Sequence, residues 1–172
     1  MPVTRNNSAE IHADHEANIE ASVEALKNLR VIIRAAARHS SWIEKHCGVT
    51  GAQLWVLQEL KEIPGLRVGQ IAEKLAIHQA TASNLLDALV KKECIDKLRD
   101  PNDHRVVRLV LSKKGSNVLK KGPRSARGLL PEALRKLDQD QLFKLNKSLA
   151  TLIEVMDIKD EMLGMQPLPF TM

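Results

Sequence analysis

Aromatic residues are almost missing from this chain of 172 residues, which has no tyrosine, two tryptophans and two phenylalanines. Leucine, isoleucine, valine and alanine must therefore build the core, as they usually do in stacked helices. The two cysteines, Cys47 and Cys94, are too few for a disulfide framework and too far apart for a CxxC motif. No apolar run approaches the roughly 20 residues that span a bilayer, and the first residues lack the apolar core of a signal peptide. These absences favour a helical core and a cytoplasmic location, with no membrane partner.

Positive charge is unevenly distributed. The formal net charge is +5, but residues 91–127 alone hold twelve lysines and arginines against four acids, a local net charge of +8. The rest of the chain sums to −3. A basic surface on a neutral-to-acidic body is typical of proteins that bind a polyanion, so nucleic acid is the first candidate partner.

The amino-terminal third carries a helical pattern. Apolar residues at three- and four-residue steps predict one long amphipathic helix over residues 17–46. Residues 1–16 are polar and show no such stripe, and we interpret them as a mobile arm. The apolar stripe of the helix consists of Ile19, Val23, Leu26, Leu29, Ile32, Ile33 and Ala36.

The carboxy-terminal third, residues 113–163, is also predicted to be helical, with a break at Gly122-Pro123 because proline cannot continue a helix. The tail over residues 164–172 contains two further prolines and is predicted to be extended. The apolar stripes of residues 17–46 and 113–163 exceed what one small domain can cover. We therefore expect these segments to form the dimerisation region of a two-fold homodimer.

Between these segments, residues 47–112 have the pattern of a winged helix-turn-helix. A short helix around Val68–Leu75 is followed, after a tight connection, by a second helix from about Gln79. Residues 95–99 and 106–111 then alternate like two strands around an Asp-Pro-Asn-Asp turn. The predicted fold class is mainly α with a small β-hairpin wing, and the second short helix has the size that fits the major groove of DNA.

The candidate DNA contacts lie on this second helix and around the hairpin. Amide and hydroxyl side chains at a helix start can read base edges, while lysine and arginine contact phosphates or a narrow minor groove. The alternatives are a solvated helix face, an ion pair that stiffens the hairpin and, for the histidine, a helix cap. The predicted DNA-binding residues are His78, Gln79, Thr81, Ser83, Asn84, Lys74, Lys91, Lys97, Arg99, Asp103, Arg105 and Arg108.

The hairpin resembles that of the MarR (multiple antibiotic resistance regulator) family of dimeric winged-helix repressors, and the resemblance extends over about residues 20–160. It implies that Asp103 holds Arg105 by an ion pair, that the wing tip enters the minor groove, and that residues 82–89 belong to the recognition helix. The chain departs from the family pattern at Glu93, Asn84 and His104, where Gly, Arg and a second Arg are common. The matching hairpin positions are Asp100, Asp103, Arg105, Val107, Leu109, Leu111, Ser112 and Gly115.

The resemblance also implies a ligand site between the dimerisation helices and the DNA-binding lobe. Arg34, Arg38, His39 and Trp42 follow one another at helical spacing, and Trp55 lies on the next predicted helix. Arginine and histidine beside tryptophan suit an anionic aromatic or phenolic ligand. The alternative is that both tryptophans are core residues and the arginines are solvated.

These patterns predict a homodimeric, sequence-specific transcriptional regulator, a repressor that a small ligand releases from a pseudo-palindromic operator. The sequence contains no catalytic set and no cofactor motif, so we do not expect an enzyme. His12 and His15, with Asp14 between them, have a spacing that could bind a metal, and we interpret it as chance. One alternative is an architectural winged helix that binds nucleic acid or protein without sequence choice, and another is the dimerisation lobe of a methyltransferase. Cys47 is interpreted as an inert thiol, with a redox switch as its alternative.

Overall fold

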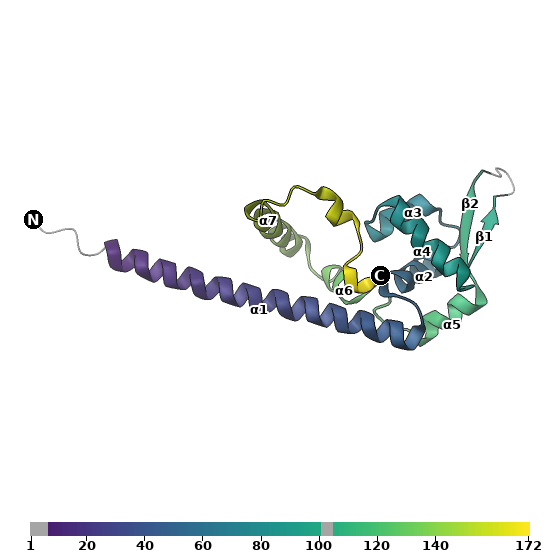
Figure 1. Cartoon of the computed structure of the whole chain (residues 1–172), viewed down its shortest axis with the longest axis horizontal. Helices are drawn as coiled ribbons and strands as arrows, with labels where there is room; N and C mark the ends of the chain where they lie inside the picture. Colours follow the sequence, from purple (N-terminus) through teal and green to yellow (C-terminus); the bar gives the residue numbers. More distant parts are fainter. Residues whose placement is uncertain (1–6, 101–104) are drawn as a thin grey trace, which may run out of the picture. The chain divides into compact units, whose positions relative to one another are not determined.

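The computed structural model describes residues 7–100 and 105–172, so the predicted site residue Asp103 lies outside the described residues. The chain divides into two compact units, one up to Ala35 and one from Ala36 onward. None of the described helices is long and apolar enough to cross a membrane. The elements, in chain order, are α1 (Asn7–Cys47), α2 (Gly51–Glu62), α3 (Val68–Leu75), α4 (Gln79–Lys91), β1 (Ile95–Arg99), β2 (Val107–Leu111), α5 (Lys113–Lys121), α6 (Leu129–Leu134), α7 (Gln139–Val155) and the 3-10 turns Glu161–Met165 and Pro169–Thr171 (Figure 1).

Helix α1 begins at Asn7, so the prediction of a non-helical arm up to residue 16 was wrong over most of its length. Residues 7–16 contain neither glycine nor proline, so nothing in this stretch stops the helix, although it lacks an apolar stripe. In the first unit the stripe of α1 is largely exposed, with Ile19 at 50% and Ile33 at 54% of full exposure. The first unit thus leaves an apolar helix face uncovered.

Helix α2 lies at the centre of the second unit. A capping box starts the helix: the amide of Gln53 donates to Thr50 Oγ1 (3.3 Å), and the amide of Thr50 donates to Gln53 Oε1 (3.2 Å). Leu54, Leu57 and Leu60 are completely buried. Around them α3, α4, α5 and β2 pack against α2, which gives the unit one continuous aliphatic core.

The two helices of the helix-turn-helix, α3 and α4, meet through a connection of three residues. Ala76 ends α3 in the left-handed conformation (φ 52°), which turns the chain sharply into α4. At the end of α4, Glu93 also adopts the left-handed conformation (φ 57°) that a glycine would take more readily. Its carboxylate pairs with Lys114 Nζ at 2.8 Å. The helix therefore ends with glycine-like geometry although the sequence has glutamate.

The wing is confirmed as an antiparallel hairpin in which β1 and β2 pair from Ile95 with Leu111 to Arg99 with Val107. An additional bridge joins Leu66 to Leu109, so the connection before α3 borders the hairpin on its other edge. Figure 1 shows the hairpin beside the end of α4. The wing is thereby fixed to the core on both sides.

The helical carboxy-terminal third is interrupted as predicted, because α5 ends at Lys121 and α6 starts only at Leu129. Asp138 and Gln141 form the capping box at the start of α7. The prediction of an extended tail was wrong, since the tail holds two 3-10 turns. Asp160 Oδ1 accepts from the amide of Met162 (3.0 Å) and starts the first turn, while Pro169 supplies the φ angle that starts the second.

Candidate DNA-binding surface and adjoining pocket

Helix α4 has one buried apolar face and one polar face. Ala82, Leu85, Leu86 and Leu89 are buried in the core. On the other face Gln79 and Asn84 are exposed and Thr81 is half-buried. The face that remains accessible therefore carries side chains that can donate to and accept from base edges.

Two of the predicted contacts at the start of α4 also have structural roles. His78 is the N-cap residue, and its Nδ1 accepts from the amide of Ala80 (3.3 Å). Ser83 Oγ donates to the carbonyl of Gln79 (3.0 Å) within the first turn. The helix start is held rigidly, which favours a fixed presentation of its polar side chains.

The wing is braced by an ion pair between Arg108 and Asp100. Arg108 Nε donates to Asp100 Oδ2 at 2.6 Å, and Asp100 is buried at 8% exposure. Arg108 was predicted to contact DNA, and the structure gives its guanidinium this second, structural partner. Arg99 and Arg105 are exposed, at the end of β1 and just before β2.

The predicted phosphate contacts Lys74, Lys91 and Lys97 have different surroundings. Lys97 Nζ pairs with Asp87 Oδ1 at 2.8 Å, which joins the wing to α4 and lowers the pKa of the exposed Asp87 carboxyl. Lys74 Nζ pairs with Glu59 Oε2 at 3.1 Å, and Lys91 is exposed in the last turn of α4. Their contact with DNA stays a prediction.

Glu59, which the sequence did not single out, is the centre of a buried polar network. Its side chain is 3% exposed and accepts from Arg127 Nε (2.6 Å), Trp55 Nε1 (3.0 Å) and Lys74 Nζ (3.1 Å). Burial raises the pKa of Glu59, but the hydrogen bonds from Arg127, Lys74 and Trp55 outweigh it and hold the pKa below its ordinary value. Arg127 also pairs with Glu62. The network joins α2, α3 and the segment before α6.

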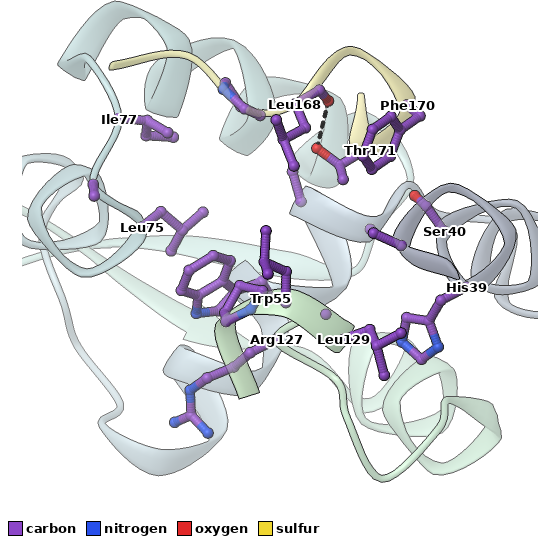
Figure 2. Close-up of a pocket in the computed structure, with 18 of the residues that line it drawn as sticks. His39, Ser40, Trp55, Leu75, Ile77, Arg127, Leu129, Leu168, Phe170 and Thr171 are labelled. Carbon is purple, nitrogen blue, oxygen red and sulfur yellow. Dashed lines mark hydrogen bonds between the residues drawn. The ribbon is translucent and has the colours of Figure 1, made fainter. Parts of the chain in front are cut away.

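A pocket of about 430 Å³ lies in the second unit. Its walls come from the end of α1, from α2, from the α3–α4 connection, from α6 and from the tail (Figure 2). His39 and Trp55, two of the five predicted ligand contacts, line it. Arg38 and Trp42 are exposed and do not line it, and Trp42 stacks on His46 with ring centroids 4.2 Å apart. Arg34, the fifth, belongs to the first unit.

The arrangement of this DNA-binding unit matches known proteins. The profile of the MarR family matches residues 49–107, which span α2 to the first residue of β2. Residues 49–107 therefore form a MarR-family domain. The function that the match supports is that of a DNA-binding transcriptional regulator.

Individual relatives are similar to this chain over different shares of its length. The chain is 27% identical to the uncharacterized HTH-type transcriptional regulator YsmB of Bacillus subtilis over 139 residues, 81% of this chain and 91% of YsmB. It is 37% identical to the HTH-type transcriptional repressor MdtR of the same organism over 68 residues, 40% of this chain and 44% of MdtR. The crystal structure of a MepR-like protein has a TM-score of 0.53, at 19% identity, over 80% of this chain and 94% of that chain. That likeness concerns the fold.

The two cysteines are buried, Cys47 at 8% and Cys94 at 2% exposure. Burial raises the pKa of both thiols, although nearby lysines act in the opposite direction. The thiolate is the reactive form of cysteine. We therefore expect the alkylation rate of both cysteines to be at least about tenfold lower in the native protein than in urea. Timed alkylation followed by mass spectrometry measures this, and rapid native labelling of Cys47 would revive the redox alternative.

Proposed function

We propose that this protein is a homodimeric repressor of the MarR family that binds a pseudo-palindromic operator, and that a small molecule relieves repression. The observation that carries the proposal is the exposed polar face at the start of α4, beside a hairpin that Asp100 and Arg108 brace. In this arrangement each α4 enters a major groove and each wing reaches the flanking minor groove, with half-sites about 34 to 36 Å apart. The repressor name of MdtR supports the direction of regulation.

Exposed apolar side chains support the dimer. In the first unit α1 exposes Ile19 and Ile33, and in the second unit α7 exposes Leu149, Leu152 and Ile153 at 39%, 42% and 50%. Large exposed apolar faces of this kind mark interaction sites. A second copy of this chain is the simplest partner, because its own α1 and α7 have the same apolar faces. A dimer also brings two copies of α4 to one duplex.

The pocket supports a ligand response. It adjoins the α3–α4 connection, because Leu75, Ala76 and Ile77 line it together with Trp55 and His39. A molecule bound there with a preference for one arrangement of α3 and α4 shifts the population toward that arrangement. An aromatic ligand fits the proposal because Trp55 offers a ring face at the pocket wall.

The test uses duplexes selected from a random pool by the purified protein. Gln79→Ala and Asn84→Ala should each weaken binding to the selected site by about 5- to 150-fold, because a good base contact is worth about 1 to 3 kcal/mol. Binding to unselected DNA should hardly change, since phosphate contacts carry it. Competition titrations at several salt concentrations measure both quantities.

The matched control is Gln139→Ala. Gln139 is an exposed glutamine at the first position of α7, and Gln79 has the same position in α4. This variant should bind the selected site like the wild type. Equal affinity of the wild type for selected and random duplexes, with the same salt slope, would favour the architectural alternative.

A further inference from the structure

We propose that residues 161–171, called the strap below, are a movable wall of the pocket that links an uncharged apolar ligand to the start of α4. The inference rests on the proposed function, because it names the ligand class and the moving part of the same site. It assigns a regulatory role to a tail that the sequence pattern predicted to be simply extended.

The strap forms one side of the pocket. Leu163, Pro167, Leu168 and Phe170 line it. Figure 2 shows Leu168 and Phe170 on the strap, on the opposite side of the cavity from Trp55. The chain itself therefore supplies an apolar cover for the apolar walls that α2 and α6 contribute.

The strap is also bonded to the recognition helix. The amide of His78 donates to the carbonyl of Met165 at 2.8 Å, and His78 is the N-cap residue of α4. Ile77, the residue before it, lines the pocket. A displacement of the strap must break or carry along this hydrogen bond at the helix start.

The strap is weakly held. Leu163 is 59% exposed and Leu168 44%, although both face the pocket with part of their side chains. Segments with few buried contacts and short 3-10 turns open at low free-energy cost. When a ligand needs more room than the pocket offers, it therefore displaces the strap more easily than the packed helices.

The lining selects against an anionic ligand. Arg127 lines the pocket, but its guanidinium is bound by Glu59 and Glu62, and Figure 2 shows it turned away from the strap. His39 Nε2 bonds to the carbonyl of Ser125 at 3.2 Å, and that oxygen can only accept. A carboxylate in this pocket would have to lose water and then compete with Glu59 for Arg127, which is costly. An uncharged molecule has a smaller cost of losing water and does not need Arg127 as a partner.

The experiment uses the full chain and two probes with the same ring system, 2-naphthamide and the anion 2-naphthoate, with affinities from isothermal titration. We expect the wild type to bind the amide at least tenfold more tightly. Phe170→Asp should weaken amide binding at least tenfold, because it places a carboxylate on the pocket side of the strap. The matched control, Met172→Asp, changes an exposed residue outside the strap and should bind like the wild type.

Hydrogen exchange at the amide of His78 tests the link to α4. Bound 2-naphthamide should speed its exchange at least threefold in the wild type, whereas Phe170→Asp should exchange fast without a probe. Leu163→Asp is a second strap variant, for which we expect the same two results. It replaces Phe170→Asp in the test if that variant folds poorly. Binding of neither probe, equal binding of both, or unchanged His78 exchange in the strap variants overturns the inference.

The selected DNA site separates this inference from the proposed function. The wild type can bind that site specifically while the strap variants keep the wild-type affinity for 2-naphthamide and the wild-type exchange at His78. In that case the strap inference fails and the repressor proposal stands. If the probes behave as expected but selected and random DNA bind equally, the repressor proposal fails and the strap remains a property of the pocket alone.

Discussion

Replacing Glu59 with glutamine is expected to lower the free energy of unfolding by about 3 kcal/mol. The change keeps the size of the side chain but removes the charge opposite Arg127 and Lys74, and the Arg127 side chain is only 11% exposed. Breaking a buried ion pair by neutralising one partner costs about 3 to 5 kcal/mol. The lower end applies here because Glu62 still pairs with Arg127.

Urea denaturation followed by circular dichroism measures this loss. The matched control is Glu62→Gln, which neutralises the other carboxylate on Arg127 in a side chain that is 43% exposed. Exposed ion pairs contribute about 0 to 1 kcal/mol, so this variant should lose less than about 1 kcal/mol. Equal losses in the two variants would contradict the central role of Glu59.

The pH dependence of stability should follow from the same carboxylate. Hydrogen bonds from Arg127, Lys74 and Trp55 hold the pKa of Glu59 below its ordinary value in the folded protein, against the opposing effect of burial. Its contribution to stability is therefore complete above the unfolded-state pKa and is lost as the pH falls through the lower folded-state pKa, in the range below about pH 4 to 5. Glu59→Gln should flatten this acid-side decline.

The secondary structure was largely predictable because its signals are local. The capping box of Thr50 with Gln53, the break at Gly122-Pro123 and the hairpin alternation each depend on residues a few positions apart. The start of α1 was misplaced because residues 7–16 contain no glycine or proline that would stop a helix, whereas the prediction required an apolar stripe. The tail was misread because proline excludes an α-helix interior but permits 3-10 turns.

The candidate site was predictable only in part. On α1, Arg38 and Trp42 are four residues apart and share one helix face, whereas His39 lies on the face that borders the pocket together with Ser40 and Ile43. Sequence spacing showed these residues together but could not show which face the pocket uses. That choice depends on packing against α2 and the tail.

The buried network was not predictable from local patterns. Glu59 and Arg127 are 68 positions apart, and each is an ordinary charged residue in its own segment. In the wing, the sequence led us to pair Asp103 with Arg105, and it did not predict the ion pair between Asp100 and Arg108. Partners that meet through the fold leave no periodic signal in the sequence.

Replacing Gly115 with alanine is expected to cost about 3 kcal/mol of stability. A Cβ at this position would lie 2.1 Å from the carbonyl oxygen of Cys94 and 2.8 Å from Leu111 Cδ1. The leucine side chain can move, but the carbonyl accepts from the amide of Ser112 at 3.1 Å, and the next residue, Ile95, is paired with Leu111 in the sheet. Overpacking costs about 1 to 3 kcal/mol, and the upper end applies where backbone must shift.

Gly69→Ala is the matched control, because it adds the same methyl group to a helical glycine with nothing within 4 Å of the new Cβ. It should leave stability unchanged or raise it by up to about 1 kcal/mol, since alanine is the better helix former. Urea denaturation of both variants decides the matter. The strain at Gly115 falls on Cys94, which directly precedes β1 of the wing, so Gly115→Ala should also weaken binding to the selected DNA site. Unaltered stability of Gly115→Ala would mean that α5 does not approach Cys94 this closely.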